Sequence, residues 1–242
     1  MTTQTALITG ANKGIGLETA RQLAQQGFHA IVAARDLAAA EQAVERLTSE
    51  GLSAEALQLD VTSSASIDSA FASVQRRHRH LDVLVNNAGI MVDAFDKAPS
   101  QQTMDAWRRT FDTNVFGLVQ VTNAFLPLLK HAPAARIVNV SSILGSMGAN
   151  VDPTSTFYGF KIPAYNISKS AVNAWTVHLA YELRDTAIKV NAAHPGFVKT
   201  DLHGVDAPMS PQEGARTSVR LATLPAEGPT GSFFHADAVQ PW

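Results

Sequence analysis

Short apolar segments alternate with longer amphipathic segments along nearly the whole chain, and this alternation restricts the possible fold more than any other feature. Six segments are apolar at nearly every position, as strands covered on both faces should be: residues 5–9, 29–34, 54–59, 81–86, 135–141 and 188–194. Five segments between them carry apolar residues at three-and-four spacing, which predicts helices: 15–27, 37–51, 64–79, 104–129 and 163–186. A weaker apolar segment, 231–236, predicts a strand at the far edge of the sheet.

Strict strand–helix alternation predicts βαβ units with right-handed crossovers, and therefore a parallel sheet with helices on both faces. We expect an α/β fold of the Rossmann type: a doubly wound, mainly parallel sheet of roughly seven strands flanked by helices. The chain has 242 residues, enough for one sizeable α/β domain. No repeat, low-complexity tract or linker divides it, so we expect residues 1–242 to form a single dinucleotide-binding and catalytic domain.

Charge and cysteine content exclude several classes of function. The formal net charge is −2, which gives no general attraction to nucleic acid or to an anionic membrane. The one basic run, residues 75–80, is typical of a helix end, where cations suit the helix dipole. There is no cysteine, which excludes disulfides, thiolate metal sites and a cysteine nucleophile. No signal peptide and no apolar run of ~20 residues is present. We expect a cytoplasmic protein without nucleic-acid or membrane partners.

A glycine-rich loop follows the first predicted strand. The sequence TGANKGIG, residues 9–16, places Gly10, Gly14 and Gly16 just before a helix. The first glycine permits a tight turn, the second lets backbone N–H groups approach a pyrophosphate, and the third lets helix and strand pack closely. The amino end of the helix favours the phosphate charge. The loop predicts dinucleotide binding, although the spacing is one residue longer than the common pattern.

The end of the second predicted strand discriminates between the two nicotinamide cofactors. NAD-binding proteins place an acidic residue there to accept hydrogen bonds from the ribose hydroxyls. Here Arg35 ends the strand, Asp36 follows it, and Lys13 in the glycine loop is a second cation that can reach the same place. Two cations suit the 2′-phosphate of NADP(H). The alternative is that both cations are surface charges and Asp36 binds the ribose.

Five motifs occur in a fixed order along the chain: TGANKGIG, NNAG (86–89), DTNVFG (112–117), VNVSS (138–142) and YNISK (165–169). Together they resemble the short-chain dehydrogenase/reductase family over essentially the whole chain. Further segments, including HPGFVKTDL (194–202), SPQEGA (210–215) and the C-terminal segment 224–242, are similar to the NADPH-dependent carbonyl reductase branch of that family. The resemblance implies reduction of an aldehyde or ketone by hydride transfer from NADP(H).

Tyr165 and Lys169 are the central catalytic candidates. Their i,i+4 spacing places both on one helix face, and a nearby lysine cation should lower the tyrosine pKa from its ordinary value of about 10. Ser142 can hydrogen-bond the substrate oxygen as its charge develops. Strand alternation turns Ser141 and Ser142 to opposite faces, and the family pattern selects Ser142. The resemblance also implies that Asn114 holds a water that links Lys169 to solvent.

The resemblance implies further cofactor contacts, residue by residue. It assigns the phosphate-binding loop to Gly10, Asn12, Lys13, Gly14, Ile15 and Gly16, and the adenine site to Asp60 and Val61. It places Asn87, Ala88 and Gly89 beside the ribose, with Lys169 and Tyr165 near the nicotinamide. It assigns the carboxamide to Pro195, Gly196, Val198 and Thr200. We expect His194 to end a strand without chemistry, and no metal site, because the histidines are scattered along the sequence.

Two departures from the family pattern concern the substrate and the assembly. The segment 145–164 is longer than usual and rich in Gly, Pro, Ser and Thr, so we expect a loop beside the active-site mouth. It leaves both a monomer and a homo-oligomer open. The segment after Thr200 is short, which indicates an open pocket for medium-sized aldehydes or ketones. Met91, Ile143, Phe160 and Phe197 are candidate apolar walls. The alternatives are an NAD-dependent alcohol dehydrogenase and a non-catalytic regulator that senses nicotinamide nucleotides.

Overall fold

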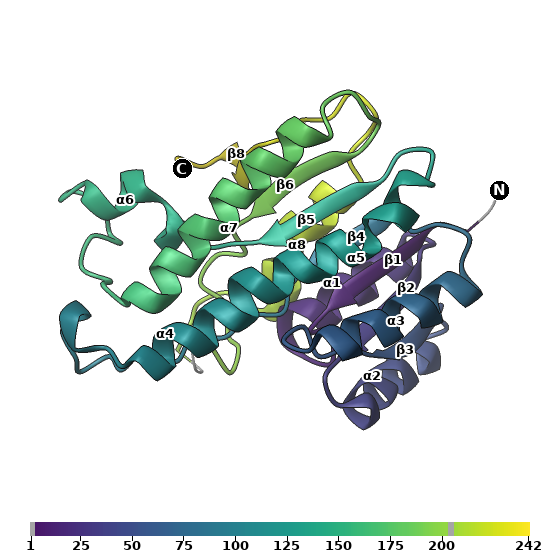
Figure 1. Cartoon of the computed structure of the whole chain (residues 1–242), viewed down its shortest axis with the longest axis horizontal. Coiled ribbons are helices and arrows are strands. Elements are labelled where there is room, and N and C mark those ends of the chain that lie inside the picture. The colour runs from purple at the N-terminus through teal and green to yellow at the C-terminus, as the bar shows by residue number, and fades with distance from the viewer. Residues whose placement is uncertain (1–2, 203–205) are drawn as a thin grey trace.

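A central sheet runs through the molecule (Figure 1). The structure is a computed structural model that describes residues 3–202 and 206–242. Within these residues the sheet has eight strands in the order β3-β2-β1-β4-β5-β6-β7-β8. Their bounds are β1 (Thr5–Thr9), β2 (His29–Ala34), β3 (Ala54–Gln58), β4 (Val83–Asn86), β5 (Arg136–Val140), β6 (Lys189–Ala193), β7 (Phe233–His235) and β8 (Ala238–Val239). Every pair is parallel except β7–β8. The predicted doubly wound fold is therefore confirmed, with β8 as an additional short edge strand.

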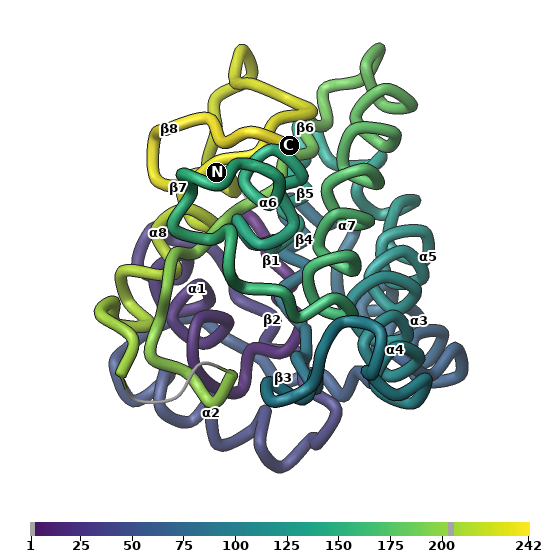
Figure 2. Tube along the Cα trace, turned by 90° about the vertical axis from the view of Figure 1, so that its left-hand side faces the viewer, coloured from purple at the N-terminus to yellow at the C-terminus, as the bar shows by residue number. Residues whose placement is uncertain are grey.

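Helices cover both faces of the sheet, as Figure 2 shows from the side. They are α1 (Gly14–Gln25), α2 (Leu37–Ser49), α3 (Ser64–Arg77), α4 (Met104–Phe111), α5 (Leu118–Lys130), α6 (Met147–Val151), α7 (Pro163–Glu182) and α8 (Pro211–Ala222). One apolar core joins the sheet to α1, α2 and α8, and the other joins it to α3, α5 and α7. None of the helices in the described ranges is both long enough and apolar enough to cross a membrane.

The direction of winding reverses beside β1. The chain moves outward from β1 to β2 and β3, then returns to β4 on the other side of β1. Crossovers on the two sides of this point cover opposite faces, so the loops that leave the strand ends separate there and make room for a ligand. This topology places the loops after β1, β2, β3 and β4 at one end of the sheet.

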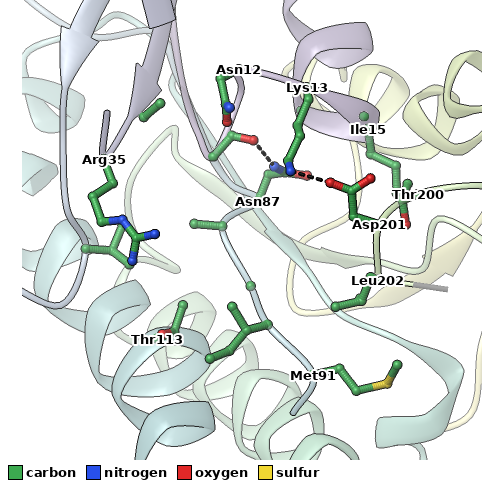
Figure 3. Close-up of a pocket in the computed structure, with 18 of the residues that line it drawn as sticks. Asn12, Lys13, Ile15, Arg35, Asn87, Met91, Thr113, Thr200, Asp201 and Leu202 are labelled. Atoms are coloured by element: carbon green, nitrogen blue, oxygen red, sulfur yellow. Dashed lines mark hydrogen bonds and ion pairs between the residues drawn. The ribbon is translucent and has the colours of Figure 1, made fainter. Parts of the chain in front are cut away.

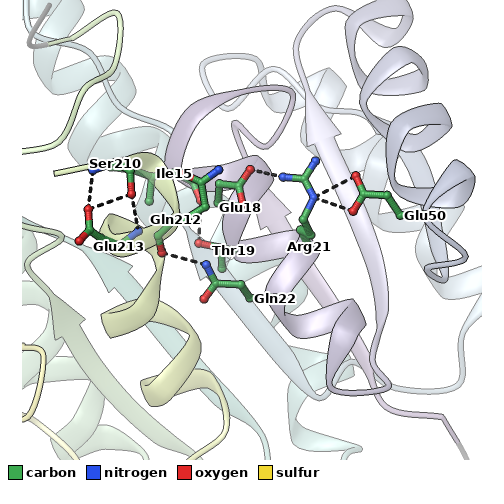
Figure 4. Close-up of polar contacts among 9 residues, drawn as sticks. All are labelled: Ile15, Glu18, Thr19, Arg21, Gln22, Glu50, Ser210, Gln212 and Glu213. Atoms are coloured by element: carbon green, nitrogen blue, oxygen red, sulfur yellow. Dashed lines mark hydrogen bonds and ion pairs between the residues drawn. The ribbon is translucent and has the colours of Figure 1, made fainter. Parts of the chain in front are cut away.

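The start of α8 is held against the side of α1. The Gln22 side chain on α1 donates a hydrogen bond to the backbone oxygen of Gln212 at 2.9 Å (Figure 4). Ser210 and Glu213 form a reciprocal capping box that begins α8: the Ser210 N–H donates to Glu213 at 2.8 Å, and the Glu213 N–H donates to Ser210 at 3.3 Å. The capping box fixes where the segment after β6 ends and α8 begins.

Three predicted boundaries were wrong. The predicted helix 104–129 is interrupted by a π-helical turn, Asp112–Gly117, between α4 and α5. The predicted loop 145–164 contains the short helix α6, whose first turn is capped by Ser146 accepting from the Ala149 N–H at 3.1 Å. The helix predicted over 163–186 ends at Glu182. The first two errors have one cause: contacts from distant parts of the chain fix the local backbone.

Candidate active site

A cavity of about 970 Å³ lies at the carboxyl ends of β1 to β4 (Figure 3). Its lining comes from the loops that follow these strands and from the segment before α8. Thirteen of the predicted cofactor residues line it: Gly10, Asn12, Lys13, Gly14, Ile15, Gly16, Arg35, Asp60, Val61, Asn87, Ala88, Gly89 and Thr200. The structure therefore brings together most of the residues that the sequence assigned to a dinucleotide.

The glycine loop has a backbone that a dinucleotide cradle requires. Gly10 and Gly14 have φ values of 62° and 57°, in the left-handed region that favours glycine. A Cβ at Gly10 would lie 2.9 Å from the Ala88 backbone, and one at Gly16 would lie 2.5 Å from the Asn87 side chain. Lys13, the residue that precedes α1, makes no side-chain cap. The amino end of α1 can therefore donate to an anionic group in the cavity.

Thr9 and Asn87 lock the glycine loop against the loop after β4. The Thr9 hydroxyl oxygen accepts from the N–H groups of Asn87 and Ala88, each at 3.0 Å. The Asn87 amide donates to the backbone oxygens of Thr9 at 2.9 Å and Gly10 at 3.1 Å. Sequence reasoning missed Thr9. The available signal was a polar residue at the end of an otherwise apolar strand.

The end of β2 presents Arg35, but not Asp36, to the cavity. Arg35 is exposed and lines the cavity. The Asp36 carboxylate instead accepts from the Ala38 N–H at 2.9 Å and caps α2. Lys13 forms an ion pair with Asp201 (Figure 3), so its charge is already partnered. Of the two cations expected to converge on a 2′-phosphate, Arg35 is the one whose position at the strand end favours that role.

Ser142, Tyr165 and Lys169 meet beside the cavity, although none of the three is among the residues that line it. Tyr165 and Lys169 lie one turn apart on α7, with the lysine Nζ 5.7 Å from the centre of the tyrosine ring. The Ser142 hydroxyl, just beyond β5, lies close enough to the Tyr165 hydroxyl to act on its pKa. The Lys169 ammonium donates to the Val140 backbone oxygen at 2.8 Å. All three side chains are buried. The structure brings these three candidates into one cluster.

Burial controls the protonation of this cluster. It raises the pKa of the Tyr165 hydroxyl to about 12, although the nearby Ser142 hydroxyl acts to lower it. It lowers the pKa of the Lys169 ammonium to about 8. The expectation that Lys169 would lower the tyrosine pKa is therefore wrong for the chain alone, because loss of hydration of the phenolate dominates. At neutral pH Tyr165 is protonated.

Ser141 points away from this cluster. Its hydroxyl donates to the Asn173 side chain at 2.6 Å and to the Lys169 backbone oxygen at 3.3 Å. It therefore attaches the end of β5 to α7. The geometry of the two neighbouring serines agrees with the choice of Ser142 over Ser141.

Asn114 occupies the π-helical turn, and its side chain makes three hydrogen bonds to the chain. Its side chain accepts from the Ile90 N–H at 2.8 Å and donates to the Ile90 backbone oxygen at 2.9 Å. It also donates to the Ser168 hydroxyl at 3.0 Å. A Cβ placed on Gly89 would lie 3.4 Å from the Asn114 oxygen and 3.5 Å from the Lys169 Nζ. Gly89 thus separates Asn114 from Lys169 and leaves space between them.

Asp93 is a residue of this site that sequence reasoning missed. Its carboxylate is buried and accepts from the N–H groups of Ala164 at 2.8 Å and Tyr165 at 3.1 Å. Ile162, the residue that precedes α7, gives no side-chain cap, so Asp93 takes this function from 71 residues away. An acidic residue after NNAG carries no signal of such a contact. Asp93 fixes the first turn of α7, where Tyr165 lies.

The segment after β6 contributes less to the cavity than expected. Pro195, Gly196 and Val198 are not among the residues that line it. Val198 is buried and forms a bridge with Met209, and Gly196 has a φ of 90°. Thr200 does line the cavity. His194 follows β6, and its Nδ1 accepts from the Ile143 and Gly196 N–H groups at 3.4 Å each.

An apolar cluster surrounds Tyr165 beside the cavity. Buried Leu144, Ile162 and Tyr165 form it, and Met91, Phe157 and Leu202 pack against it. Met91 and Leu202 also line the cavity. Of the predicted walls, Met91 is therefore well placed, whereas Ile143 is buried and Phe160 and Phe197 are half exposed. Leu202 and Phe157 were not foreseen.

A second tyrosine–lysine pair, Tyr158 and Lys161, lies outside the Ser142–Tyr165–Lys169 cluster. Tyr158 is 44% exposed, and the Lys161 ammonium sits 4.7 Å above its ring. Lys161 also donates to the Asn150 backbone oxygen at 2.7 Å. Both residues belong to the turns that precede Pro163, so the pair is at the surface and outside the Ser142–Tyr165–Lys169 cluster.

Comparison with known proteins identifies the chain's relatives. A family model described as short chain dehydrogenase matches residues 4–209. The short-chain dehydrogenase anuI of Penicillium roqueforti (strain FM164) is 41% identical over 223 residues, covering 90% of this chain and 87% of the relative. Carbonyl reductase (NADPH) 1 of Mus musculus is 36% identical over an alignment of 275 residues, covering 98% of both chains.

Solved structures agree with these sequence relatives. The NADPH-bound carbonyl reductase from chicken fatty liver has a TM-score of 0.86 and 28% sequence identity, with all of both chains covered. Salutaridine reductase from Papaver somniferum has a TM-score of 0.84 and 27% identity, covering 97% of this chain and 100% of that structure. The resemblance stated from the sequence motifs is confirmed.

Proposed function

The chain belongs to the short-chain dehydrogenase family, and from this premise we propose that it is an NADPH-dependent oxidoreductase that reduces aldehyde or ketone carbonyls to alcohols. One observation carries the proposal: the buried Tyr165 side chain, close to Ser142 and Lys169, lies beside a cavity that fits a dinucleotide. Relatives named as NADPH carbonyl reductases, 36% identical in the mouse case, support the same assignment.

The cavity residues fit a nicotinamide dinucleotide with a 2′-phosphate. The glycine loop and the amino end of α1 would hold the pyrophosphate, and Arg35 would bind the 2′-phosphate with its guanidinium. Asp36 is engaged in capping α2, which favours NADP(H) over NAD(H). Asp60 and Val61 would contact the adenine, and Asn87, Ala88 and Gly89 would line the ribose. When bound, NADPH supplies the hydride.

Tyr165 would donate the proton that the substrate oxygen takes up during reduction. Because burial raises the pKa of Tyr165 to about 12, the hydroxyl is protonated at neutral pH and ready to act as the acid. Ser142 would donate a hydrogen bond to the same oxygen as negative charge develops there. Lys169 would stabilise the tyrosinate left behind, and Asn114 would hold the water through which the proton is replaced.

The substrate would lie between the Tyr165 hydroxyl and the apolar cluster around it. Met91 and Leu202 line the cavity and pack against that cluster, so they are suited to an apolar substituent on the carbonyl carbon. We therefore propose medium-sized aldehydes or ketones as substrates. Residues 1–242 would act as one catalytic domain. A cytoplasmic location is proposed on the sequence alone, which has no cysteine.

A substrate panel tests this function. The purified chain is incubated with NADPH or NADH and with aldehydes and ketones of increasing size, and the absorbance of the reduced nicotinamide is followed. We expect carbonyl-dependent oxidation of NADPH, with NADH used at least about tenfold less efficiently. Equal or better use of NADH would favour the NAD-dependent alcohol dehydrogenase. Tight NADPH binding without oxidation by any carbonyl would favour the non-catalytic regulator.

A further inference from the structure

Two histidines and a glutamate meet at the end of the sheet opposite the cavity. His29 begins β2, Glu55 lies near the start of β3, and His78 follows the last residue of α3. Among the described residues, one atom from each lies within 4.8 Å of the others. His29, Glu55 and His78 are far apart in the sequence, and scattered histidines led us to expect none with a carboxylate partner. That expectation is wrong here, because the parallel pairing of β2 and β3 brings distant residues together.

The side chains are already oriented toward a common point. His78 Nε2 lies 2.8 Å from Glu55 Oε1, and His29 Nε2 lies 3.7 Å from Glu55 Oε2. The other ring nitrogen of His29, Nδ1, is 2.7 Å from the Ser53 hydroxyl. That bond fixes the ring orientation and leaves Nε2 for a ligand on the Glu55 side. All three side chains are mostly buried, with 16% to 23% of each exposed.

We propose that His29, Glu55 and His78 bind a zinc ion, with water as the fourth ligand. Two imidazoles and a carboxylate suit zinc and its transition-metal neighbours, whereas magnesium and calcium prefer oxygen ligands. In a tetrahedral zinc site with bonds of about 2.1 Å, ligand atoms are about 3.4 Å apart. One candidate ligand atom from each residue lies within 4.8 Å of the others, so side-chain movements of about 1 Å suffice to reach that value.

Among the described residues, Arg77 is a cation that competes for the Glu55 carboxylate. Its Nη1 donates to Glu55 Oε2 at 2.6 Å, and its Nε and Nη2 are held by Ser73. The zinc ion needs only Oε1, so Arg77 can keep Oε2 and orient the carboxylate from outside the site.

The proposed site is structural and remote from the cavity. His29 is at the start of β2, and the cavity begins at Ala34, five residues further along the strand. At about 3.3 Å per residue, this places the two sites roughly 16 Å apart. A zinc ion here would join β2, β3 and the end of α3, and it would stabilise the folded chain because the unfolded chain holds no such cluster.

Titration with zinc chloride tests the proposal after removal of bound metal with a chelator. Isothermal titration calorimetry and thermal unfolding are measured for the wild type and for His29→Gln and His78→Gln as separate variants. His178→Gln is the matched control, since His178 is exposed on α7 and outside the cluster. Using two ligand variants keeps the test valid if one of them fails to fold.

We expect one zinc ion per wild-type chain and a rise in melting temperature on binding. Each ligand variant should bind zinc at least about tenfold more weakly and lose the rise, while His178→Gln should behave as the wild type. Magnesium chloride should raise the melting temperature of none of them. Wild-type chain that binds no zinc, or ligand variants that bind it as tightly as His178→Gln, would overturn the proposal.

Discussion

The Asp93 carboxylate accepts a hydrogen bond from the backbone N–H of Tyr165 at 3.1 Å, as well as one from the preceding residue. A buried acid that reaches the start of α7 from 72 residues away is therefore part of what positions the proposed proton donor. The chain belongs to a family of oxidoreductases, and Tyr165 of the Ser142–Tyr165–Lys169 cluster lies on this helix turn. The contact therefore predicts that Asp93 affects catalysis.

Asp93→Ala should lower kcat by about tenfold or more while changing the KM for NADPH much less. The substitution leaves two helix N–H groups without an acceptor, which costs about 1 kcal/mol of stability and loosens the first turn of α7. Steady-state kinetics separate kcat from KM. Asp93→Ser should recover part of the loss, since serine is a good cap, and Asp96→Ala, at an exposed neighbour, should be unchanged. A normal kcat in Asp93→Ala would contradict the positioning role.

Arg35→Asp should weaken NADPH binding and reverse the cofactor preference. Arg35 is exposed at the end of β2 and lines the cavity, so its guanidinium would supply charge-assisted hydrogen bonds worth about 1.5–3 kcal/mol. We expect the Kd for NADPH to rise by about 10- to 100-fold and that for NADH to change little. Arg46→Asp makes the same change of charge on the exposed side of α2 and is the control. Equal losses in both variants would indicate only a general charge effect.

Lys169→Met should stabilise the fold at pH 7 while abolishing activity. Burial lowers the pKa of Lys169 from 10.5 to about 8, so below pH 8 the folded chain holds a costly buried charge. Between pH 8 and 10.5 the folded chain has lost this proton and the unfolded chain has not, so the cost disappears as the pH rises. The pKa shift corresponds to a destabilisation of the folded chain by about 3 kcal/mol. Replacing Lys169 removes this cost but also removes the hydrogen bond to Val140, which contributes about 1 kcal/mol of stability.

We therefore expect Lys169→Met to be more stable than the wild type by on the order of 2 kcal/mol at pH 7, with the difference shrinking toward pH 10. Urea unfolding at the two pH values measures it. Tyr165 changes the free energy of unfolding in the opposite direction as the pH rises, because its raised pKa lowers stability only above pH 10. Lys161→Met, at an exposed lysine, is the control. A difference that does not change with pH would be inconsistent with a buried charge.

Asn114→Ala should reduce both activity and stability. The side chain makes three hydrogen bonds that join the π-helical turn to Ile90 and Ser168. Their loss leaves buried backbone groups without partners, which costs about 1–3 kcal/mol. Turnover should fall by more than the folded fraction does, since the water that Asn114 is proposed to hold is lost as well. Circular dichroism and kinetics on the same sample test this, with Asn123→Ala on the exposed face of α5 as control.

The sheet was predictable because its strands are buried on both faces. β1 and β2 have the predicted bounds of residues 5–9 and 29–34, since apolar runs mark both strands, Gly10 follows β1 and Gly27 precedes β2. The π-helical turn was not predictable, because Asn114 binds a backbone 24 residues away. Helix α6 was missed for a similar reason: the Trp242 backbone oxygen, at the other end of the chain, accepts from the Gly148 N–H at 3.0 Å and from Ser146 at 3.2 Å.

In the candidate site too, local sequence patterns were predictable, whereas contacts between distant residues were not. The placement of Tyr165 and Lys169 on one helix face was predictable because their i,i+4 spacing is local, and the glycine loop was recognisable because its residues are adjacent. Asp93 was missed, since its contact with α7 exists only in the fold. The pKa of Tyr165 was predicted in the wrong direction. Charge proximity can be read from spacing, whereas burial, which dominates here, depends on the packed structure.

The most direct test of the account compares Tyr165→Phe with Tyr158→Phe. Both changes remove one phenolic hydroxyl, but Tyr165 is buried beside Ser142 and Tyr158 is exposed at the surface. The rate of carbonyl-dependent NADPH oxidation should fall by at least about 100-fold in Tyr165→Phe, because the general acid is lost. NADPH affinity should change much less, and Tyr158→Phe should retain nearly full turnover. Normal turnover in Tyr165→Phe, or loss in Tyr158→Phe alone, would contradict the assignment of Tyr165 as the proton donor.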